Sequence, residues 1–261
     1  MDLQLNGYRF LVCGASSGFG RAIAETLLSE SDQVECIVTA RRGSLLQDIY
    51  SKKYGNRVTI LEGDLTQSST LNEVVKASTS APLQGAVLNA GGPPTGTPME
   101  TSMEQWDEAF RLVMRWKIDL SLKLVPHMTG QGYGRLLFVE SKSIKQPIPY
   151  LVLSNSFRAG IAGFAKSLAT EIASKGVTVN LLAPGAHDTP AITRVIERRS
   201  KSEGISFEQA KAKAEESIPV GRMGKAEEIA SLAAWLLSPH ASYVTGQTIS
   251  HDGGAISGLF G

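Results

Sequence analysis

The sequence predicts an α/β fold: one doubly wound domain in which helices cover both faces of a parallel, seven-stranded sheet. Two observations lead to this prediction. Short apolar runs alternate along the chain with longer segments of helical periodicity, which is typical of parallel sheets. The runs are apolar throughout, as in strands that are buried on both faces. A chain of 261 residues fits a single domain, 1–261, with a full core.

The expected elements follow one another in a regular order. The first strand is the apolar run 10–13, and it leads into helix 21–28, where Ile23 and Leu27 mark one side. Six further runs are expected to be strands, at 34–40, 57–61, 86–89, 135–140, 178–182 and 247–250. Segments with helical patterns lie between them, at 45–54, 70–78, 102–129, 155–174 and 226–237.

One charged stretch, 192–216, interrupts this order between the sixth strand and the last long helix. Its helical pattern fits a solvated surface helix. It also fits a helical insertion in a substrate loop, forming a mobile lid over the carboxyl ends of the strands, where ligands bind in folds of this class. Both interpretations stay open.

Composition and charge exclude several classes of protein. The net charge is +1, so no basic field predicts nucleic-acid binding. No apolar run reaches about 18 residues, and the short polar start at 1–8 does not resemble a signal peptide, so we expect a cytoplasmic protein without a membrane segment. Cys13 and Cys36 fall in predicted strands and are expected to be buried thiols. The histidines lack metal-ligand spacing, so no metal site is expected.

Three glycines separate the first strand from the first helix: Gly14, Gly18 and Gly20. Glycine allows a positive φ and a close approach of the backbone to a ligand, and the following helix N-terminus presents free N–H groups to an anion. Strand, glycine turn and helix in this order predict a phosphate cradle. The spacing is G-x-x-x-G-x-G instead of the common G-x-G-x-x-G, and an ordinary tight turn is the alternative.

The glycine loop resembles the T-G-x-x-x-G-x-G motif of the short-chain dehydrogenase/reductase family, with Cys13 in the place of the threonine. Further motifs of that family follow in order over nearly the whole chain: Asp64-Leu65, Asn89-Ala90-Gly91, Pro184-Gly185 with Thr189, Ile218 to Arg222, and Tyr243 to Gln247 closing on Asp252-Gly253-Gly254. The resemblance is to its 3-oxoacyl-[acyl-carrier-protein] reductase-like members. It implies a Rossmann-type fold that binds a nicotinamide dinucleotide.

The resemblance also implies which residues contact that cofactor: Gly14, Ser16, Ser17, Gly18, Phe19, Gly20, Asp64, Leu65, Asn89, Gly91, Arg158, Pro184, Gly185 and Thr189. At the end of the second strand, a carboxylate would accept hydrogen bonds from the ribose of NAD, but Ala40 stands there and Arg41-Arg42 follow. A guanidinium binds phosphate as a bidentate fork. We therefore favour NADP(H) over NAD(H), with Arg41 on the 2′-phosphate and Arg42 assisting. The alternative is that both arginines are merely solvated.

Three of the four catalytic positions depart from the family. Ser141 stands where the family has its serine, but Ser154, Arg158 and Val113 stand where it has tyrosine, lysine and asparagine. A serine hydroxyl is too weak an acid to replace the tyrosine without a neighbouring base, and arginine does not relay protons. Arginine can still hold ribose hydroxyls. We take Ser141, Ser154 and Arg158 as the candidate catalytic residues.

Other residues could supply the proton instead. His187 lies in the loop expected at the nicotinamide, and Tyr150 lies four residues before Ser154. Lys142, Lys145 and Lys117 are further candidates. A packing or surface role explains each of these residues as well.

Two functions follow from this pattern. The first is an NADP(H)-dependent oxidoreductase that transfers a hydride between nicotinamide and a small carbonyl or alcohol, in a pocket stiffened by prolines at 93, 94, 147 and 149. The alternative is a catalytically degenerate relative that binds the nucleotide as a sensor or scaffold; a different reaction on the same scaffold also stays open. The resemblance implies a homo-oligomer, a dimer or tetramer, paired through helices 102–129 and 155–174. The apolar spacing of Phe157, Ile161, Phe164 and Leu168 fits this interface, but it fits core packing equally.

Overall fold

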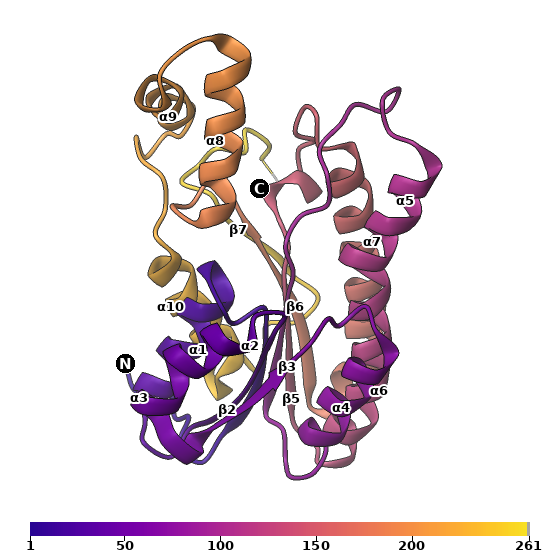
Figure 1. The fold of residues 1–261 in the computed structure, drawn as a ribbon. Coiled ribbons are helices and arrows are strands. Elements are labelled where there is room, and N and C mark those ends of the chain that lie inside the picture. Colours follow the sequence, from indigo (N-terminus) through magenta and orange to yellow (C-terminus); the bar gives the residue numbers. More distant parts are fainter. Residues whose placement is uncertain (260–261) are drawn as a thin grey trace.

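The computed structural model describes residues 1–259, without the side chains of residues 191 and 194, so the last two residues of the predicted domain lie outside the described residues. A seven-stranded sheet runs through its centre in the order β3-β2-β1-β4-β5-β6-β7, and every neighbouring pair is parallel (Figure 1). The strands are β1 (Arg9–Cys13), β2 (Glu35–Ala40), β3 (Val58–Glu62), β4 (Gly85–Asn89), β5 (Gly134–Val139), β6 (Val177–Pro184) and β7 (Thr248–His251). The predicted fold class is confirmed.

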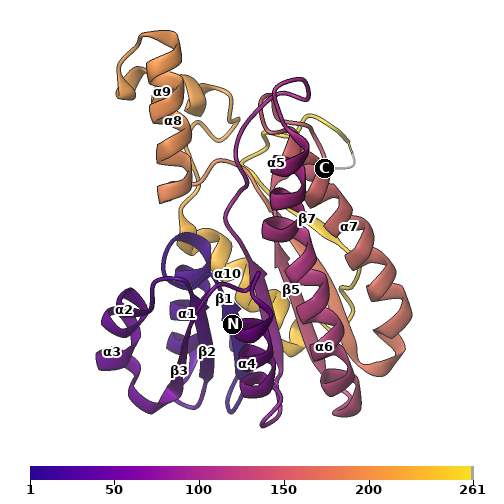
Figure 2. The same cartoon turned by 45° about the vertical axis from the view of Figure 1, so that its right-hand side comes forward.

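Helices cover both faces of the sheet (Figures 1 and 2). On one face lie α1 (Gly18–Glu30), α10 (Ala226–Leu237) and the short α2 (Gly43–Leu46) and α3 (Lys52–Tyr54). On the other face lie α4 (Ser68–Ser78), α6 (Trp116–Gly130) and α7 (Val152–Ile172), with α5 (Met103–Ala109) continuing the line of α6.

Successive residues of each strand point to opposite faces, so each strand contributes to two cores. On β5, Leu137 and Val139 join the core under α1 and α10, whereas Leu136 and Phe138 join the core under α6 and α7. By the same alternation, the next residue in phase with Phe138 is Glu140, directly after the strand. The carboxylate of Glu140 therefore lies on the same buried side as Leu136 and Phe138.

Two predicted helices contain π-helical turns that the sequence did not indicate. The predicted helix 102–129 is α5, a π-helical turn over Phe110–Arg115 and then α6. The predicted helix 45–54 is α2, a π-helical turn over Gln47–Ser51 and then α3. Neither turn contains glycine or proline, so local propensity gives no signal for it. Both segments are helical without interruption, close to the predicted extents, and the difference is the wider π-helical turn within each.

The predicted insertion 192–216 is two helices, α8 (Pro190–Glu203) and α9 (Phe207–Glu216). Gly204, with φ +65°, ends α8, and Ser206 begins α9 with a capping box to Gln209. The pair stands beyond the carboxyl ends of the strands (Figures 1 and 2). It has a small apolar cluster of its own, formed by Ile196, Ala210, Ile218 and Met223. Its position suits a lid, and its mobility stays a prediction.

The sheet order reverses between β1 and β4, whose neighbours lie on opposite sides. In an open α/β sheet, ligands bind in the crevice at the carboxyl ends of the strands on either side of this reversal. Across residues 1–259, none of the helices combines the length and the apolarity needed to cross a membrane.

Candidate functional site

The glycine loop lies at this crevice, between β1 and α1. Gly14 and Gly18 have φ of +68° and +53°, which favour glycine. A Cβ on Gly20 would lie 2.3 Å from the carbonyl oxygen of Gly14, and one on Gly14 would lie 2.8 Å from the side-chain nitrogen of Asn89. No larger residue fits at these positions. The loop is thus a cradle of bare backbone at the N-terminus of a 13-residue helix, which suits a pyrophosphate.

Contacts from neighbouring segments hold the loop in place. The backbone N–H groups of Gly14 and Ala15 both donate to the carbonyl of Thr39, at 2.8 and 3.2 Å. The buried hydroxyl of Tyr50 donates to the carbonyl of Ala15 at 2.8 Å. Tyr50 lies in the π-helical turn after α2, so that turn helps to fix the cradle before any ligand binds.

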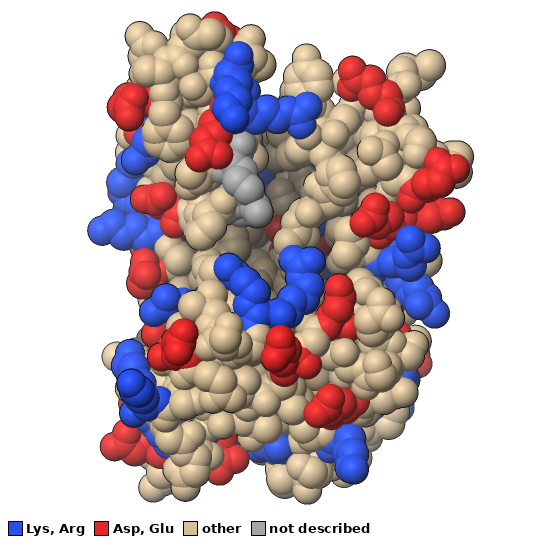
Figure 3. Space-filling model, viewed as in Figure 1, with Lys and Arg blue, Asp and Glu red and all other residues tan. Residues whose placement is uncertain are grey.

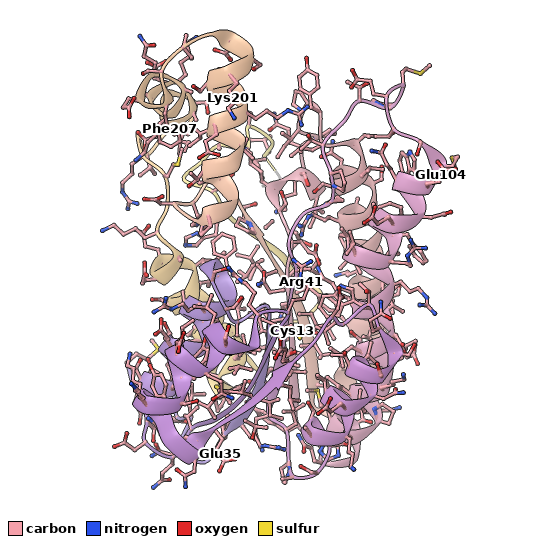
Figure 4. The ribbon with its side chains drawn as sticks, in the orientation of Figure 1. Cys13, Glu35, Arg41, Glu104, Lys201 and Phe207 are labelled. Carbon is pink, nitrogen blue, oxygen red and sulfur yellow. The ribbon has the colours of Figure 1, made fainter. Side chains whose placement is uncertain are left out.

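Arg42, and not Arg41, is the arginine joined to the loop. Its Nη2 donates to the hydroxyls of Ser16 and Ser17, at 3.0 and 3.1 Å. The structure shows that Arg42 already contacts the glycine loop. Which of the two arginines binds a 2′-phosphate stays a prediction. Arg41 is exposed and stands near Cys13 at the carboxyl edge of the sheet (Figure 4). In the same orientation, Figure 3 shows a hollow below the α8–α9 lobe, with Lys and Arg side chains at its lower rim.

The predicted adenine-contacting pair follows β3 at the same edge. Asp64 accepts a hydrogen bond from the backbone N–H of Thr66 at 2.9 Å, and Leu65 packs against the core under α4 and α6. Asn89 ends β4 beneath Gly14. Their contacts with a nucleotide stay predictions.

The loop at the end of β6 carries Pro184, Gly185 and Thr189. Gly185 has no room for a side chain, since a Cβ would lie 2.8 Å from Cα of Asp252. Thr189 precedes α8, and its side chain lies 3.7 Å from where a Cβ of Gly18 would be. An open cavity of about 490 Å³ is lined by Asp188, Thr189, Pro190 and Thr193. Thr189 therefore both lines this cavity and lies next to the glycine loop.

Of the candidate catalytic residues, Ser141 lies just after β5, and Ser154 and Arg158 lie on α7. Nε of Arg158 donates to the hydroxyl of Ser154 at 3.0 Å, and its Nη2 donates to the carbonyl of Gly91 at 3.3 Å. Ser154 and Arg158 are buried. Ser141 accepts a hydrogen bond from the backbone N–H of Ser143 at 3.1 Å. The structure thus brings Ser154, Arg158 and Gly91 into direct contact, with Ser141 at the end of the neighbouring strand.

Two charged residues that the sequence analysis did not combine complete this cluster. Nη1 of Arg158 donates to Oε2 of Glu140 at 2.8 Å, and Nζ of Lys117 donates to Oε1 of the same carboxylate. The side chains of Lys117 and Glu140 are fully buried. The sequence could have indicated Glu140, because it is a carboxylate in phase with the apolar residues of a buried strand. A buried carboxylate requires a cationic partner.

Burial determines the electrostatics of this cluster. It lowers the pKa of Lys117, and the charge of Glu140 opposes that shift. It also raises the pKa of the nearby Cys13 thiol to about 12, so this thiol is neutral. Val113, at the family's asparagine position, is buried one turn before Lys117 and supplies no polar group.

His187 is buried with both ring nitrogens in hydrogen bonds. Nδ1 lies 3.1 Å from the carbonyl of Gly185, and Nε2 lies 2.9 Å from Nδ1 of His251. The edge of the ring packs against Phe19 of the glycine loop, with centroids 5.1 Å apart. Burial lowers the pKa of His187. This residue connects the glycine loop, the loop after β6 and β7, and it offers no free nitrogen for proton transfer.

Tyr150 is exposed, and Lys142 and Lys145 lie in and directly after a short 3-10 turn that follows Ser141. Tyr150 is 64% exposed, and no hydrogen bond of the described residues joins its hydroxyl to the cluster. Its backbone carbonyl instead accepts from the N–H of Gly96 at 2.7 Å. This contact joins the proline-containing loop after β4 to the loop before α7, so the two form one wall beside the crevice.

The apolar pattern on α7 has a packing explanation within one chain. Ile161 and Leu168 are buried in the core under α6 and α7, and Phe164 packs edge-on against Phe138. Phe157 contacts the rings of Trp106 and Phe110, at centroid distances of 5.6 and 5.9 Å. An oligomer through this face stays a prediction.

Comparison with known proteins identifies relatives over the full length. The family described as enoyl-(acyl carrier protein) reductase matches residues 14–255. The 3-oxoacyl-[acyl-carrier-protein] reductase FabG of Escherichia coli (strain K12) is 31% identical over 252 residues, covering 97% of this chain and 98% of that protein. The NADPH-dependent reductase BacG of Bacillus subtilis (strain 168) is 30% identical over 255 residues, covering 95% and 97%.

Solved structures agree with this comparison. L-sorbose reductase from Gluconobacter frateurii, complexed with NADPH and L-sorbose, superposes with a TM-score of 0.92 at 29% identity, covering 99% of this chain and 100% of that one. A variant of actinorhodin polyketide ketoreductase with NADPH superposes with a TM-score of 0.88 at 28% identity, covering 95% and 97%.

Proposed function

The chain belongs to the short-chain dehydrogenase/reductase family and is an oxidoreductase, and from this premise we propose that it transfers a hydride between NADP(H) and a small carbonyl or alcohol substrate. The observation that carries the proposal is the hydrogen bond from Arg158 to Ser154, buried beside Gly91 at the crevice. It joins, in one contact, a group able to hold the cofactor and a hydroxyl able to meet a substrate oxygen.

The residues of the crevice fit the cofactor. Gly14 and Gly20 have no room for a Cβ against Asn89 and against the Gly14 carbonyl, so only glycine permits this tight turn. The turn leads into the N-terminus of α1, whose free N–H groups suit a pyrophosphate. Arg42 with Ser16 and Ser17 would hold the 2′-phosphate, because a guanidinium and two hydroxyls form a phosphate-binding set. Arg158 and the carbonyl of Gly91 would hold the nicotinamide ribose, and the segment from Pro184 to Thr189 the carboxamide end. When bound, the cofactor supplies the hydride.

The side chains of the cluster orient and polarise the substrate oxygen. Ser154 accepts from Arg158 and Ser141 accepts from the backbone, so each hydroxyl keeps its proton to donate. With the cofactor bound, hydride transfer would move the electron pair of the C=O bond to the oxygen, where the hydroxyls of Ser141 and Ser154 would stabilise the charge. Arginine does not release a proton near neutral pH, so the proton that completes the alcohol would come from solvent through the hydroxyl of Ser154.

The named relatives support a reductase. NADPH appears in the names or titles of BacG, the sorbose reductase and the polyketide ketoreductase. A non-catalytic nucleotide-binding protein is the less favoured alternative, because relatives along the whole chain are named as reductases. We further propose a cytoplasmic homo-oligomer, a dimer or tetramer.

The test begins with fluorescence titration of the purified protein with NADPH and NADH. The NADPH complex is then mixed with a panel of small ketones and aldehydes while the absorbance of reduced nicotinamide is followed. Oxidation of NADPH by a panel member, lost in Ser154→Ala and in Ser141→Ala, supports the proposal. Tight NADPH binding without turnover on any member of a broad panel favours the non-catalytic alternative.

A further inference from the structure

The buried cluster at the end of β5 has two cations for one anion. Lys117 comes from α6, Glu140 follows β5 and Arg158 comes from α7. The carboxylate bridges them, with Oε1 on Lys117 and Oε2 on Arg158. Within residues 1–259, neither cation forms a salt bridge with a second carboxylate. Burial lowers the pKa of Lys117, and the carboxylate of Glu140 opposes that shift, so this ion pair is what favours the ammonium form. With all three groups ionised, the cluster carries one surplus positive charge.

The remaining neighbours do not neutralise this charge. The Cys13 thiol near Lys117 is neutral, since burial raises its pKa to about 12. Among the described residues, the other hydrogen bonds of the Arg158 side chain go to the neutral hydroxyl of Ser154 and to the carbonyl of Gly91. Because the side chains of Lys117 and Arg158 are 0% and 6% exposed, water screens the surplus charge poorly.

The surplus charge lies at the end of the crevice proposed to hold the nicotinamide. One nitrogen of the Arg158 guanidinium donates to Glu140, and the other two donate to Ser154 and Gly91. Ser154 and Gly91 are the residues proposed to face the substrate and the nicotinamide ribose. Glu140 is thereby a positioning residue for Arg158. Lys117 touches neither Ser154 nor Gly91 through a hydrogen bond of the described residues, so its contribution to this end of the site is its charge.

We infer that the Lys117–Glu140–Arg158 cluster selects the reduced cofactor and sets the enzyme to work as a reductase. The nicotinamide ring is neutral in NADPH and cationic in NADP⁺, so a buried positive charge beside it repels only the oxidised form. Preferential binding of NADPH and ready release of NADP⁺ favour carbonyl reduction over alcohol oxidation. The inference rests on the proposed function, since it requires the nicotinamide end to lie at Arg158.

Calorimetric titration with NADPH and with NADP⁺ tests the inference without any substrate. We expect the intact protein to bind NADPH about tenfold more tightly than NADP⁺, the order of effect for one partly screened charge. Lys117→Met removes the surplus charge, so the ratio should fall to about one. The double variant Lys117→Met, Glu140→Gln has the surplus positive charge again, because Arg158 then has no anionic partner. The carboxamide still accepts a hydrogen bond from Arg158, and the ratio should return to about tenfold.

Two further variants control the experiment. Lys123→Met removes an exposed lysine from the same helix and should leave the ratio of affinities unchanged. Lys117→Gln removes the charge but keeps a hydrogen-bond donor, and it replaces Lys117→Met if that variant does not fold.

The outcomes separate the inference from its premise. If Lys117→Met and Lys117→Gln have the same ratio of NADPH affinity to NADP⁺ affinity as the intact protein, the inference is overturned while the proposed reductase function stands. A double variant that stays at the ratio of Lys117→Met also overturns it, because the net charge has then been restored without effect. Failure to bind either nucleotide removes the proposed function and the inference together.

Discussion

Nη1 of Arg158 lies 2.8 Å from Oε2 of Glu140, in a buried ion pair that ties α7 to the end of β5. The same guanidinium donates to Ser154 and Gly91, so each of its three nitrogens donates to a different partner. The planar guanidinium places each of its nitrogens against a different partner, whereas a lysine ammonium would present its three donors from a single atom.

Removal of Arg158 should destabilise the protein as well as inactivate it. In Arg158→Met, the buried carboxylate keeps only Lys117, and breaking a buried pair in this way costs about 3 kcal/mol in the free energy of unfolding. Urea denaturation measures this cost. The control is Arg199→Met, which breaks an exposed pair with Glu203 and should cost under about 1 kcal/mol. Similar costs for both variants would contradict the structural role of the buried pair.

Arg42 should determine the preference for NADPH. Arg42→Gln removes the guanidinium held beside Ser16 and Ser17, so the affinity for NADPH should fall by about 10- to 100-fold while the affinity for NADH is unchanged. Arg41→Gln should have the smaller effect, because Arg41 is exposed and is not joined to the loop. Fluorescence titration of both variants measures the difference. A larger loss from Arg41→Gln would restore the original sequence-based order of the two arginines.

Gly20 should not tolerate a side chain. In Gly20→Ala, the Cβ would lie 2.3 Å from the carbonyl oxygen of Gly14, so the cradle must open at a cost of about 2 kcal/mol, with loss of nucleotide binding. Thermal unfolding and NADPH titration measure both effects. Gly130→Ala is the matched control, since a Cβ there meets no atom within 4 Å, and it should leave stability and binding intact. Normal NADPH affinity in Gly20→Ala would refute the proposed pyrophosphate site.

Stability should decrease in acid because of His187. Burial lowers the pKa of His187 below the ordinary 6.5, so the folded protein holds this ring neutral while the unfolded chain takes up a proton as pH falls through 6.5. Its contribution is therefore complete above pH 6.5 and is lost progressively below it, toward the lower pKa of the folded state.

Thermal unfolding between about pH 8 and pH 5 measures this dependence. His187→Gln, which does not titrate, should be less stable at neutral pH but should show a flatter pH profile. His127→Gln, at a partly exposed histidine of α6, should keep the profile of the intact protein. Parallel profiles for the intact protein and His187→Gln would exclude the role of this ring.

The amino-acid sequence was sufficient to predict the fold and the position of the glycine turn, because both depend on patterns that are local along the chain. Apolar runs that alternate with helical periodicity predict a parallel sheet, and the order of strand, glycine turn and helix predicts where a phosphate could approach the backbone. The candidates Ser141, Ser154 and Arg158 came from the resemblance to the family, and their roles stay predictions.

The pairing of the charged groups became apparent only in the folded structure. Lys117 lies on α6, Glu140 directly follows β5 and Arg158 lies on α7, so their contact depends on how these helices pack against the strand, with a π-helical turn directly before α6. That Arg42 turns back toward Ser16 likewise depends on how the two loops lie in the fold. Side-chain pairing across elements is a property of packing geometry, and the order of residues along one strand or helix does not specify it.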